Sequence, residues 1–218
     1  MNNAQLINQT SLTVEHYTPP EIIALVHQMW GEDGIDFDPA SSPVANQTVR
    51  ARVICTAPKC HQIGVTVGLP LMNTDDRGGL DVGWHGRVWL NHPFGQPVAP
   101  CKTDCVKASC RKRGYHVTHG LPGSSNWINK FLAEYRVGRM EEGISIQYAA
   151  TSEAWFRPLH NYARCWIYGR TNYMDADGRR QMGATKGSCL VYVGRRWAEF
   201  QSIFSDIGRV DLAGADWM

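Results

Sequence analysis

The stretch Asn91-His92-Pro93-Phe94 constrains the fold of this chain more than any other. It directly follows Gly86-Arg87-Val88-Trp89-Leu90, a short apolar run typical of a buried strand. Gly95, Pro97 and Pro100 then prevent that strand from continuing. We therefore expect a carboxamide, an imidazole, a proline and an aromatic ring at the carboxyl end of a strand, where open α/β sheets bind ligands. Taken alone, the four residues also fit a strand that simply ends in a proline turn.

Apolar segments with helical and strand spacing alternate along the rest of the chain. Helices are expected near residues 19–30, 124–137 and 197–207, and strands near residues 35–38, 86–90, 144–150, 165–168 and 188–193. Alternation of this kind predicts an α/β fold, with a mostly parallel sheet, helices on both faces and an antiparallel final pair. Thr18 is expected to cap the first helix, and residues 151–156 are expected to form a short one.

Composition favours one globular domain. The chain has 218 residues, of which 43% are hydrophobic and 19% charged, and residues 1–15 form a polar lead-in. The net charge of +2 means that any binding to nucleic acid must depend on a local patch. No apolar run approaches the roughly 20 residues of a membrane span, and no signal-peptide pattern is seen. We expect a cytoplasmic location, in which the seven cysteines serve as thiols or metal ligands rather than disulfides.

Three of these cysteines and a histidine are concentrated in a small insertion, residues 97–122. Cys101, Cys105, Cys110 and His116 have the spacing C-x3-C-x4-C-x5-H, and structural zinc is held by four such sulfur and nitrogen ligands. The sequence therefore predicts a zinc site. Unliganded thiols and redox or iron–sulfur chemistry are the alternatives, and the fourth zinc ligand could also come from the following set: His119, Cys60 and His61.

The same insertion is basic. One acidic residue, Asp104, stands against five basic ones: Lys102, Lys107, Arg111, Lys112 and Arg113. Such a run often forms only a solvated face. Beside a candidate active strand, however, it predicts contact with nucleic-acid phosphates.

A second candidate site precedes the first. Ile35-Asp36-Phe37-Asp38 reads as a short strand that breaks into the small-residue turn Pro39-Ala40-Ser41. Small residues let the backbone approach a ligand, and a carboxylate can bind the hydroxyl or ammonium groups of a nucleoside cofactor. A plain Asp-Pro turn is the alternative interpretation.

Together these segments resemble the DNA N6-adenine methyltransferases carried by phages and prophages (a Dam-like family), over about residues 15–200 without the cysteine loop. Tyr17-Thr18-Pro19-Pro20-Glu21 is similar to the family's first-helix motif, and Asp38-Pro39-Ala40-Ser41 to its cofactor-binding loop. Asn91-His92-Pro93-Phe94 stands where the family has Asn-Pro-Pro-Tyr/Phe, and Gly169-Arg170 resembles a Gly-Arg strand end.

The resemblance implies a Rossmann-like methyltransferase fold, S-adenosylmethionine as methyl donor, and double-stranded DNA with a flipped-out adenine as substrate. The Asn91 side-chain oxygen and the carbonyl of His92 would accept hydrogen bonds from the adenine amine, Pro93 would fix the turn, and Phe94 would stack on the base. The implied cofactor-binding residues are Tyr17, Thr18, Pro19, Asp36, Asp38, Pro39, Ala40 and Ser41. The residues expected to bind DNA are Lys107, Arg111, Lys112, Arg113 and Arg170.

Two features depart from the family pattern. His92 replaces the first proline, which makes the turn less rigid and places an imidazole near the methyl donor. The cysteine loop is not taken as common to the family. Two alternatives therefore stay open: an inactive methyltransferase-like, zinc-containing protein that binds nucleic acid, and the same fold acting on RNA or on another planar amine or amide.

Overall fold

The architecture is taken from a computed structural model, which describes residues 16–32, 34–56, 59–62, 78–102, 104–113, 116, 120–175 and 177–212. The predicted lead-in, residues 1–15, lies outside this part of the chain, as do Arg77 and most of the loop before it.

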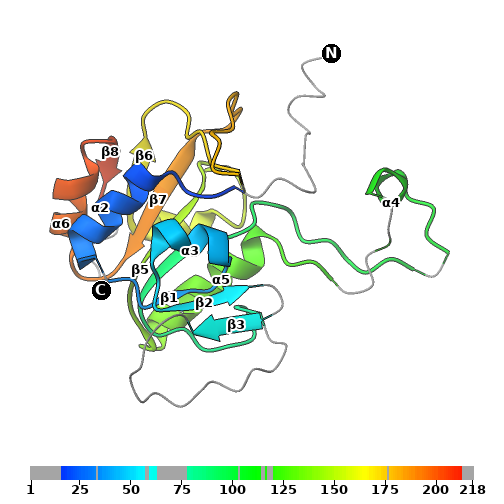
Figure 1. The fold of residues 1–218 in the computed structure, drawn as a ribbon, viewed down its shortest axis with the longest axis horizontal. Coiled ribbons are helices and arrows are strands. Elements are labelled where there is room, and N and C mark those ends of the chain that lie inside the picture. Colours follow the sequence, from blue (N-terminus) through cyan, green and yellow to red (C-terminus); the bar gives the residue numbers. More distant parts are fainter. Residues whose placement is uncertain are drawn as a thin grey trace.

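An eight-stranded mixed sheet forms the centre of the molecule, in the order β3-β2-β1-β4-β5-β7-β6-β8 (Figure 1). The strands are β1 (Phe37–Asp38), β2 (Val53–Thr56), β3 (Lys59–Gln62), β4 (Gly86–Asn91), β5 (Met140–Tyr148), β6 (Ala163–Ile167), β7 (Ser188–Val193) and β8 (Gly208–Asp211).

Strand direction divides this sheet into two parts. The strands β2, β1, β4 and β5 are parallel to one another, whereas β3, β7, β6 and β8 each join their neighbours antiparallel. The expectation of a mostly parallel sheet is therefore right for the central strands only. β6 runs in the same direction as β5 because the reversed strand β7 lies between them. The predicted antiparallel final pair is confirmed in β6 and β7.

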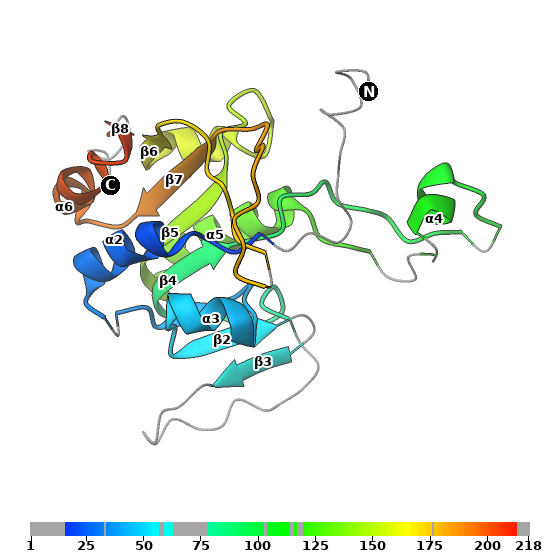
Figure 2. The same cartoon turned by 45° about the horizontal axis from the view of Figure 1, so that its top comes forward.

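Helices cover both faces, as predicted. One face carries α2 (Pro20–Trp30), α3 (Pro43–Val49) and α6 (Trp197–Phe204), and the other carries α5 (Ser124–Arg136) and the short 3-10 helix η1 (Arg157–Asn161) (Figures 1 and 2). The strand β4 is buried between the two layers: Trp89 belongs to the core under α2 and α6, while Val88 and Leu90 belong to the core under α5. Continuous apolar sequence is what a strand covered on both faces requires.

Local sequence explains where several helices begin. Ser42 caps α3 by accepting a hydrogen bond from the amide of Ala45 at 3.1 Å, and Pro43 occupies the first helical turn. Residue patterns assigned no definite element to residues 44–49, so this helix was not predicted. The prediction that Thr18 caps the first helix is wrong, because the N-cap of α2 is Pro19 and no side chain caps it.

Two further expectations are corrected near the end of the chain. Residues 151–156 form turns rather than a helix, and η1 begins only at Arg157, with Pro158 in its first turn. The helix expected near residues 197–207 ends at Phe204, and Gly208 opens β8, which pairs with β6 at the sheet edge.

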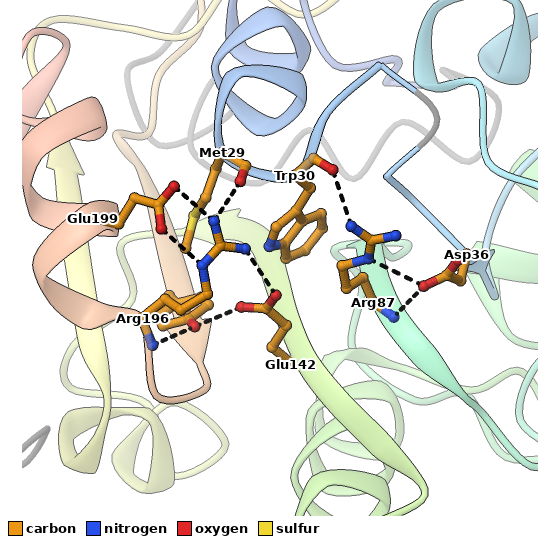
Figure 3. A network of polar contacts seen from close by, with 8 residues as sticks. Met29, Trp30, Asp36, Arg87, Glu142, Arg196 and Glu199 are labelled. Atoms are coloured by element: carbon orange, nitrogen blue, oxygen red, sulfur yellow. Dashed lines mark hydrogen bonds and ion pairs between the residues drawn. The ribbon is translucent and has the colours of Figure 1, made fainter.

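A polar network fixes the C-terminal end of α2 to the sheet (Figure 3). Arg87 donates to the carbonyl of Trp30 and pairs with Asp36. Arg196 donates to the carbonyl of Met29 and pairs with Glu142, and with Glu199 of α6. The last carbonyls of a helix have no partner within it, so both arginines satisfy groups that the helix itself cannot.

The Cys/His insertion leaves the body of the protein as an arm, residues 97–122, with α4 (Ala108–Arg113) at its far end (Figures 1 and 2). A two-way backbone bridge between Val98 and Leu121 closes its base, with both N–H···O distances 2.9 Å. The arm starts directly after the Asn91–Phe94 turn and returns directly before α5.

Candidate functional site

The two motifs that the sequence singled out lie at adjacent strand ends. β1 and β4 are parallel neighbours, with Phe37 opposite Val88, so Asp38 and Asn91 both lie toward the carboxyl ends of their strands. The chain continues from β1 to β2 on one side, whereas β4 lies on the other. This is a topological switch point, and the crevice outside such strand ends is where open α/β sheets bind ligands.

Asp38 is a buried carboxylate at this point. Its Oδ1 accepts a hydrogen bond from the amide of Ala40 at 3.2 Å. Burial raises the pKa of Asp38 to about 7, against the opposing effects of the Ser41 side chain and the Ala40 amide. A carboxylate held at this desolvation cost is well placed to bind a hydroxyl or a cation.

The backbone after Asp38 is closely approached by Gly79. A Cβ at Gly79 would lie 1.9 Å from the carbonyl oxygen of Pro39, so only glycine fits there. The carbonyl of Gly79 in turn accepts a hydrogen bond from the buried indole of Trp84 at 2.6 Å. These contacts fix the predicted Pro39-Ala40-Ser41 turn from the side of the following loop.

Asp36, also predicted to bind the cofactor, interacts with different residues from Asp38. It precedes β1, and its carboxylate accepts from the backbone and side chain of Arg87 at 2.9 and 3.2 Å and pairs with Arg52 at 3.3 Å. The structure thus gives Asp36 a structural role in joining β1, β2 and β4, and its contact with a cofactor stays a prediction.

The side chain of Asn91 is held by the segment before α2. Its Nδ2 donates to the carbonyl oxygen of His16 at 2.7 Å and to Oγ1 of Thr18 at 3.1 Å. Both amide hydrogens are therefore used, and within the described part of the chain Oδ1 accepts no hydrogen bond. That oxygen is an acceptor at the carboxyl end of β4.

The same segment reaches the other motif. The backbone of Tyr17 pairs with Met174 in both directions, at 2.9 and 2.8 Å, and its hydroxyl accepts from Ser42 at 3.3 Å. We call residues 16–18 the clasp, because they connect the β4 turn, the start of α3 and the β6–β7 loop. Of the predicted cofactor-binding residues in the clasp, Tyr17 contacts Ser42, directly after the β1 loop, whereas the Thr18 side chain contacts Asn91.

His92 is buried rather than exposed toward the site. Its ring lies edge-on to Phe94 and Trp155, with centroids 5.4 and 6.4 Å away. Nδ1 contacts the carbonyl oxygen of Pro93 at 2.9 Å, so this nitrogen carries the hydrogen, and the bond stiffens a turn that we expected to be loose. Burial lowers the pKa of His92 to about 4, which keeps the ring neutral.

Phe94 stands in a cluster of aromatic rings beside Asn91. Tyr148 lies 4.5 Å from it, Tyr173 5.6 Å and His16 6.2 Å, centroid to centroid. Asn91 is opposite Ile146 in the sheet, which brings Tyr148, two residues further along β5, next to this turn. Phe94 remains half-buried and Pro93 exposed, so the turn is open to solvent on one side.

Sequence reasoning missed this aromatic cluster and the cation beside it. Lys186 lies over the ring of Tyr148, 5.1 Å from its centroid, and exposed Arg170 lies against Gly187. An aromatic residue at the end of a strand next to the Asn91 strand was the available signal. The rest depends on the path of the long β6–β7 loop, which residue patterns do not give.

The predicted metal ligands come together in the arm. The ligand atoms of Cys101, Cys105, Cys110 and His116 all lie within 4.8 Å of one another, and the Cys110 sulfur is 3.4 and 3.6 Å from the other two. Sulfur and nitrogen ligands around one tetrahedral zinc ion are about 3.3–3.8 Å apart. This Cys/His cluster could therefore hold a metal ion such as zinc. Of the alternative fourth ligands, His119 and the side chains of Cys60 and His61 lie outside the described residues.

Charge on the arm is exposed. Lys107 and Arg111 flank Cys110 and are both solvent-accessible, as is Lys102. Lys112 and Arg113 belong to α4, but their side chains lie outside the described part.

The expectation that the cysteines are thiols holds for five of them, including buried Cys165 and Cys189. It is wrong for Cys55, which is disulfide-bonded.

No helix among the described residues is long and apolar enough to cross a membrane. A scan against protein-family models, a search of curated proteins and a search of solved structures each find no match.

Proposed function

We propose that this protein transfers a methyl group from S-adenosylmethionine to the exocyclic N6 amine of adenine in double-stranded DNA. The observation that carries the proposal is the hydrogen bonding of the Asn91 side chain. Its two amide hydrogens are bound by the clasp, which leaves Oδ1 as an acceptor at the carboxyl end of β4. A planar amine that donates a hydrogen bond is the group such an oxygen would bind.

The chemistry of the acceptor explains why this oxygen matters. The lone pair of an adenine amine is delocalised into the ring, so the amine is a poor nucleophile. Hydrogen bonds from its N–H groups to Asn91 Oδ1 and to the His92 carbonyl would draw that lone pair out of conjugation. Catalysis would then consist of alignment and charge placement, with no strong base required. The His92 ring is buried and has no part in this step, so the proposal gives His92 a role through its backbone carbonyl alone.

The sheet supports the cofactor part of the proposal. The parallel order β2-β1-β4-β5 followed by reversed β7 and then β6 is compatible with a Rossmann-like methyltransferase sheet. S-adenosylmethionine supplies an activated methyl group when bound, and it carries hydroxyl and ammonium groups. Buried Asp38, at the switch point beside Asn91, fits either of these groups, and the turn Pro39-Ala40-Ser41 lets the backbone come close.

The aromatic and basic residues around the turn support a nucleic-acid substrate. Phe94 and Tyr148 offer half-buried rings at the turn, backed by the buried ring of Tyr173, and flipped bases are held by such rings. Lys186 and Arg170 add positive charge beside Tyr148, at the carboxyl end of β5. The arm carries two further exposed cations, Lys107 and Arg111. We propose that zinc in the Cys/His cluster stabilises the arm as a DNA-recognition element.

The arm also favours a second candidate function. A zinc-containing, basic arm on an inactive methyltransferase-like body would bind nucleic acid without modifying it. Calorimetric titration with S-adenosylmethionine separates the two, because the second candidate should bind DNA and give no heat with the cofactor.

Transfer of labelled methyl groups tests the proposal directly. Purified protein is incubated with labelled S-adenosylmethionine and a mixed-sequence duplex library, with RNA and protein as parallel substrates, and the modified base is mapped. Label on adenine N6 of DNA is expected, and label on RNA or protein alone would reject the DNA assignment. Asn91→Ala should abolish transfer and keep cofactor binding, whereas exposed Asn161→Ala should leave both unchanged.

A further inference from the structure

The contact between Thr18 and Asn91 joins a residue predicted to bind the cofactor to one predicted to bind the substrate amine. Thr18 is buried, with 5% of its surface exposed, and its Oγ1 lies 3.1 Å from Asn91 Nδ2. Its hydroxyl is not used by the helix that follows, since α2 begins after Pro19 without a side-chain cap. Among the described residues, this hydroxyl has one hydrogen-bond partner, the side chain of the candidate catalytic asparagine.

The amide of Asn91 can take two orientations, related by a half-turn that exchanges oxygen and nitrogen. In the alternative orientation Oδ1 would face the carbonyl oxygen of His16, and two acceptors at hydrogen-bond distance repel each other. The observed orientation satisfies both hydrogens and leaves Oδ1 free for a donor. The His16 carbonyl thus selects the orientation, and Thr18 holds the second hydrogen and with it the plane of the amide.

The clasp that carries these two acceptors is itself fixed. Tyr17, between them, pairs with Met174 of the β6–β7 loop and accepts from Ser42 at the start of α3. Just beyond, Glu21 and Arg180 form a two-point ion pair at 2.7 and 3.0 Å between α2 and the same loop. The clasp can therefore hold the Asn91 side chain against rotation.

We infer that Thr18 is a positioning residue, which acts through Asn91 and aims its side-chain oxygen at the substrate amine. The inference rests on the proposed function for the nature of the substrate, but the clasp is a property of the protein alone. It assigns to Thr18 a role different from cofactor contact and from helix capping.

Three variants test the inference. Thr18→Val keeps the side-chain shape and removes the acceptor, Thr18→Ser keeps the hydroxyl, and Thr171→Val makes the same exchange at another buried threonine, whose Oγ1 has no partner among the described residues. Thr18→Val is expected to lower kcat by about 10- to 100-fold, the effect of a small misplacement of a reacting group. Its Kd for S-adenosylmethionine should stay within about twofold of the wild type, because the change lies in alignment and not in cofactor contact.

The two other variants separate positioning from packing. Thr18→Ser should restore most of kcat, and Thr171→Val should leave it unchanged. A wild-type kcat in Thr18→Val would overturn the inference. So would equal losses in Thr18→Val and Thr18→Ser, because shape and not the hydroxyl would then be responsible.

A second readout does not depend on activity. In a ¹⁵N-labelled protein the Asn91 side-chain amide signals are assigned by their loss in Asn91→Ala. Thr18→Val should move one of the two Nδ2 hydrogen signals and speed its exchange with solvent, while Thr18→Ser should not. If the wild type methylates nothing and these signals still respond, the proposed reaction fails and the clasp stands; signals unmoved in Thr18→Val would reject the clasp.

Discussion

Arg87 and Arg196 bind neighbouring carbonyls at the same helix end, one from a strand and the other from the start of a helix. Arg87, in β4, donates to Trp30 at 2.9 Å, and Arg196, after β7, donates to Met29 at 2.7 Å (Figure 3). Both carbonyls belong to the last turn of α2, whose other end follows the clasp. Residues distant in sequence thus fix the helix that the candidate site depends on.

Removing the Arg196 guanidinium should destabilise the fold. Arg196→Met leaves buried Glu142 with Tyr192 as its remaining described partner and frees the Met29 carbonyl, and losses of this kind cost about 1–3 kcal/mol. The free energy of unfolding, measured in urea, should fall by that amount. Arg195→Met, the same exchange at the exposed neighbouring arginine, should change it little. Equal stability of the two variants would contradict this role.

Asp38 should make the protein more stable in acid than in base. Its pKa is about 7 in the fold and 3.8 in an unperturbed carboxyl, so the folded protein keeps a proton that the unfolded chain loses. The contribution of Asp38 to the free energy of unfolding is complete below about pH 4. It is lost as the pH rises to 7, by on the order of 4 kcal/mol at most. Asp38→Asn should therefore melt at a higher temperature than the wild type at pH 8 and show no such gain near pH 4. Exposed Asp81→Asn should follow the wild type at every pH.

Substitutions of His92 should show which ring nitrogen matters. The amide nitrogen of asparagine can replace Nδ1 and reach the Pro93 carbonyl, whereas glutamine places its amide nearer Nε2. His92→Asn should therefore keep methyl transfer closer to the wild-type rate than His92→Gln does, in steady-state assays. The reverse order would show that the Pro93 bond does not hold the turn.

The pKa of His92 gives a separate test. Since it lies at about 4, below the ordinary value of 6.5, the stability that neutral His92 contributes is present above pH 6.5 and is lost as the pH falls toward 4. His92→Asn should remove that loss in thermal melts between pH 4 and 6.5. Asp38 changes stability with the opposite sign in the same pH interval. The double variant His92→Asn/Asp38→Asn lacks both titrating groups, so its melting curve is the baseline against which each single variant is compared.

Metal removal should loosen the arm and spare the body. One zinc ion per chain is expected on elemental analysis, and Cys105→Ser should lower that content while Cys189→Ala, outside the Cys/His cluster, should not. With a chelator, trypsin should cut faster after Lys102, Lys107 and Arg111. Metal-free protein with an unchanged digestion pattern would reject a structural metal.

The sequence predicted those parts of the molecule that depend on near neighbours. β4 and β7 were found because apolar runs end at clear breakers, and the Cys/His cluster because its ligands lie within sixteen residues of one another. Strand direction is not encoded in apolar spacing, so the antiparallel pairing of β7 with β5 was missed, although that of β6 with β7 was predicted. The edge strands β3 and β8 were not predicted at all. α3 was missed because its apolar face is short, although Ser42-Pro43 carried a start signal.

The candidate site was only half predictable for the same reason. Asp38 and Asn91 were chosen as strand ends, and the sheet places those ends side by side. The partner of the Asn91 amide, 73 residues away at Thr18, follows from no local pattern. His92 was predicted to make the turn less rigid. Its burial and its hydrogen bond to the Pro93 carbonyl depend on the fold and could not be predicted from the sequence.

Exposed charge on the arm should contribute to DNA affinity without setting sequence preference. Arg111→Ala removes one cation beside the Cys/His cluster, and Arg209→Ala removes one on the edge strand β8, at the far side of the sheet from the arm. If Arg111 neutralises a phosphate, its loss should weaken binding to all duplexes alike and reduce the slope of log K against log salt concentration by about one. Fluorescence anisotropy at several salt concentrations measures both effects. Arg209→Ala should leave slope and affinity unchanged, and an equal response of the two variants would show that only net charge, and not the arm, is responsible.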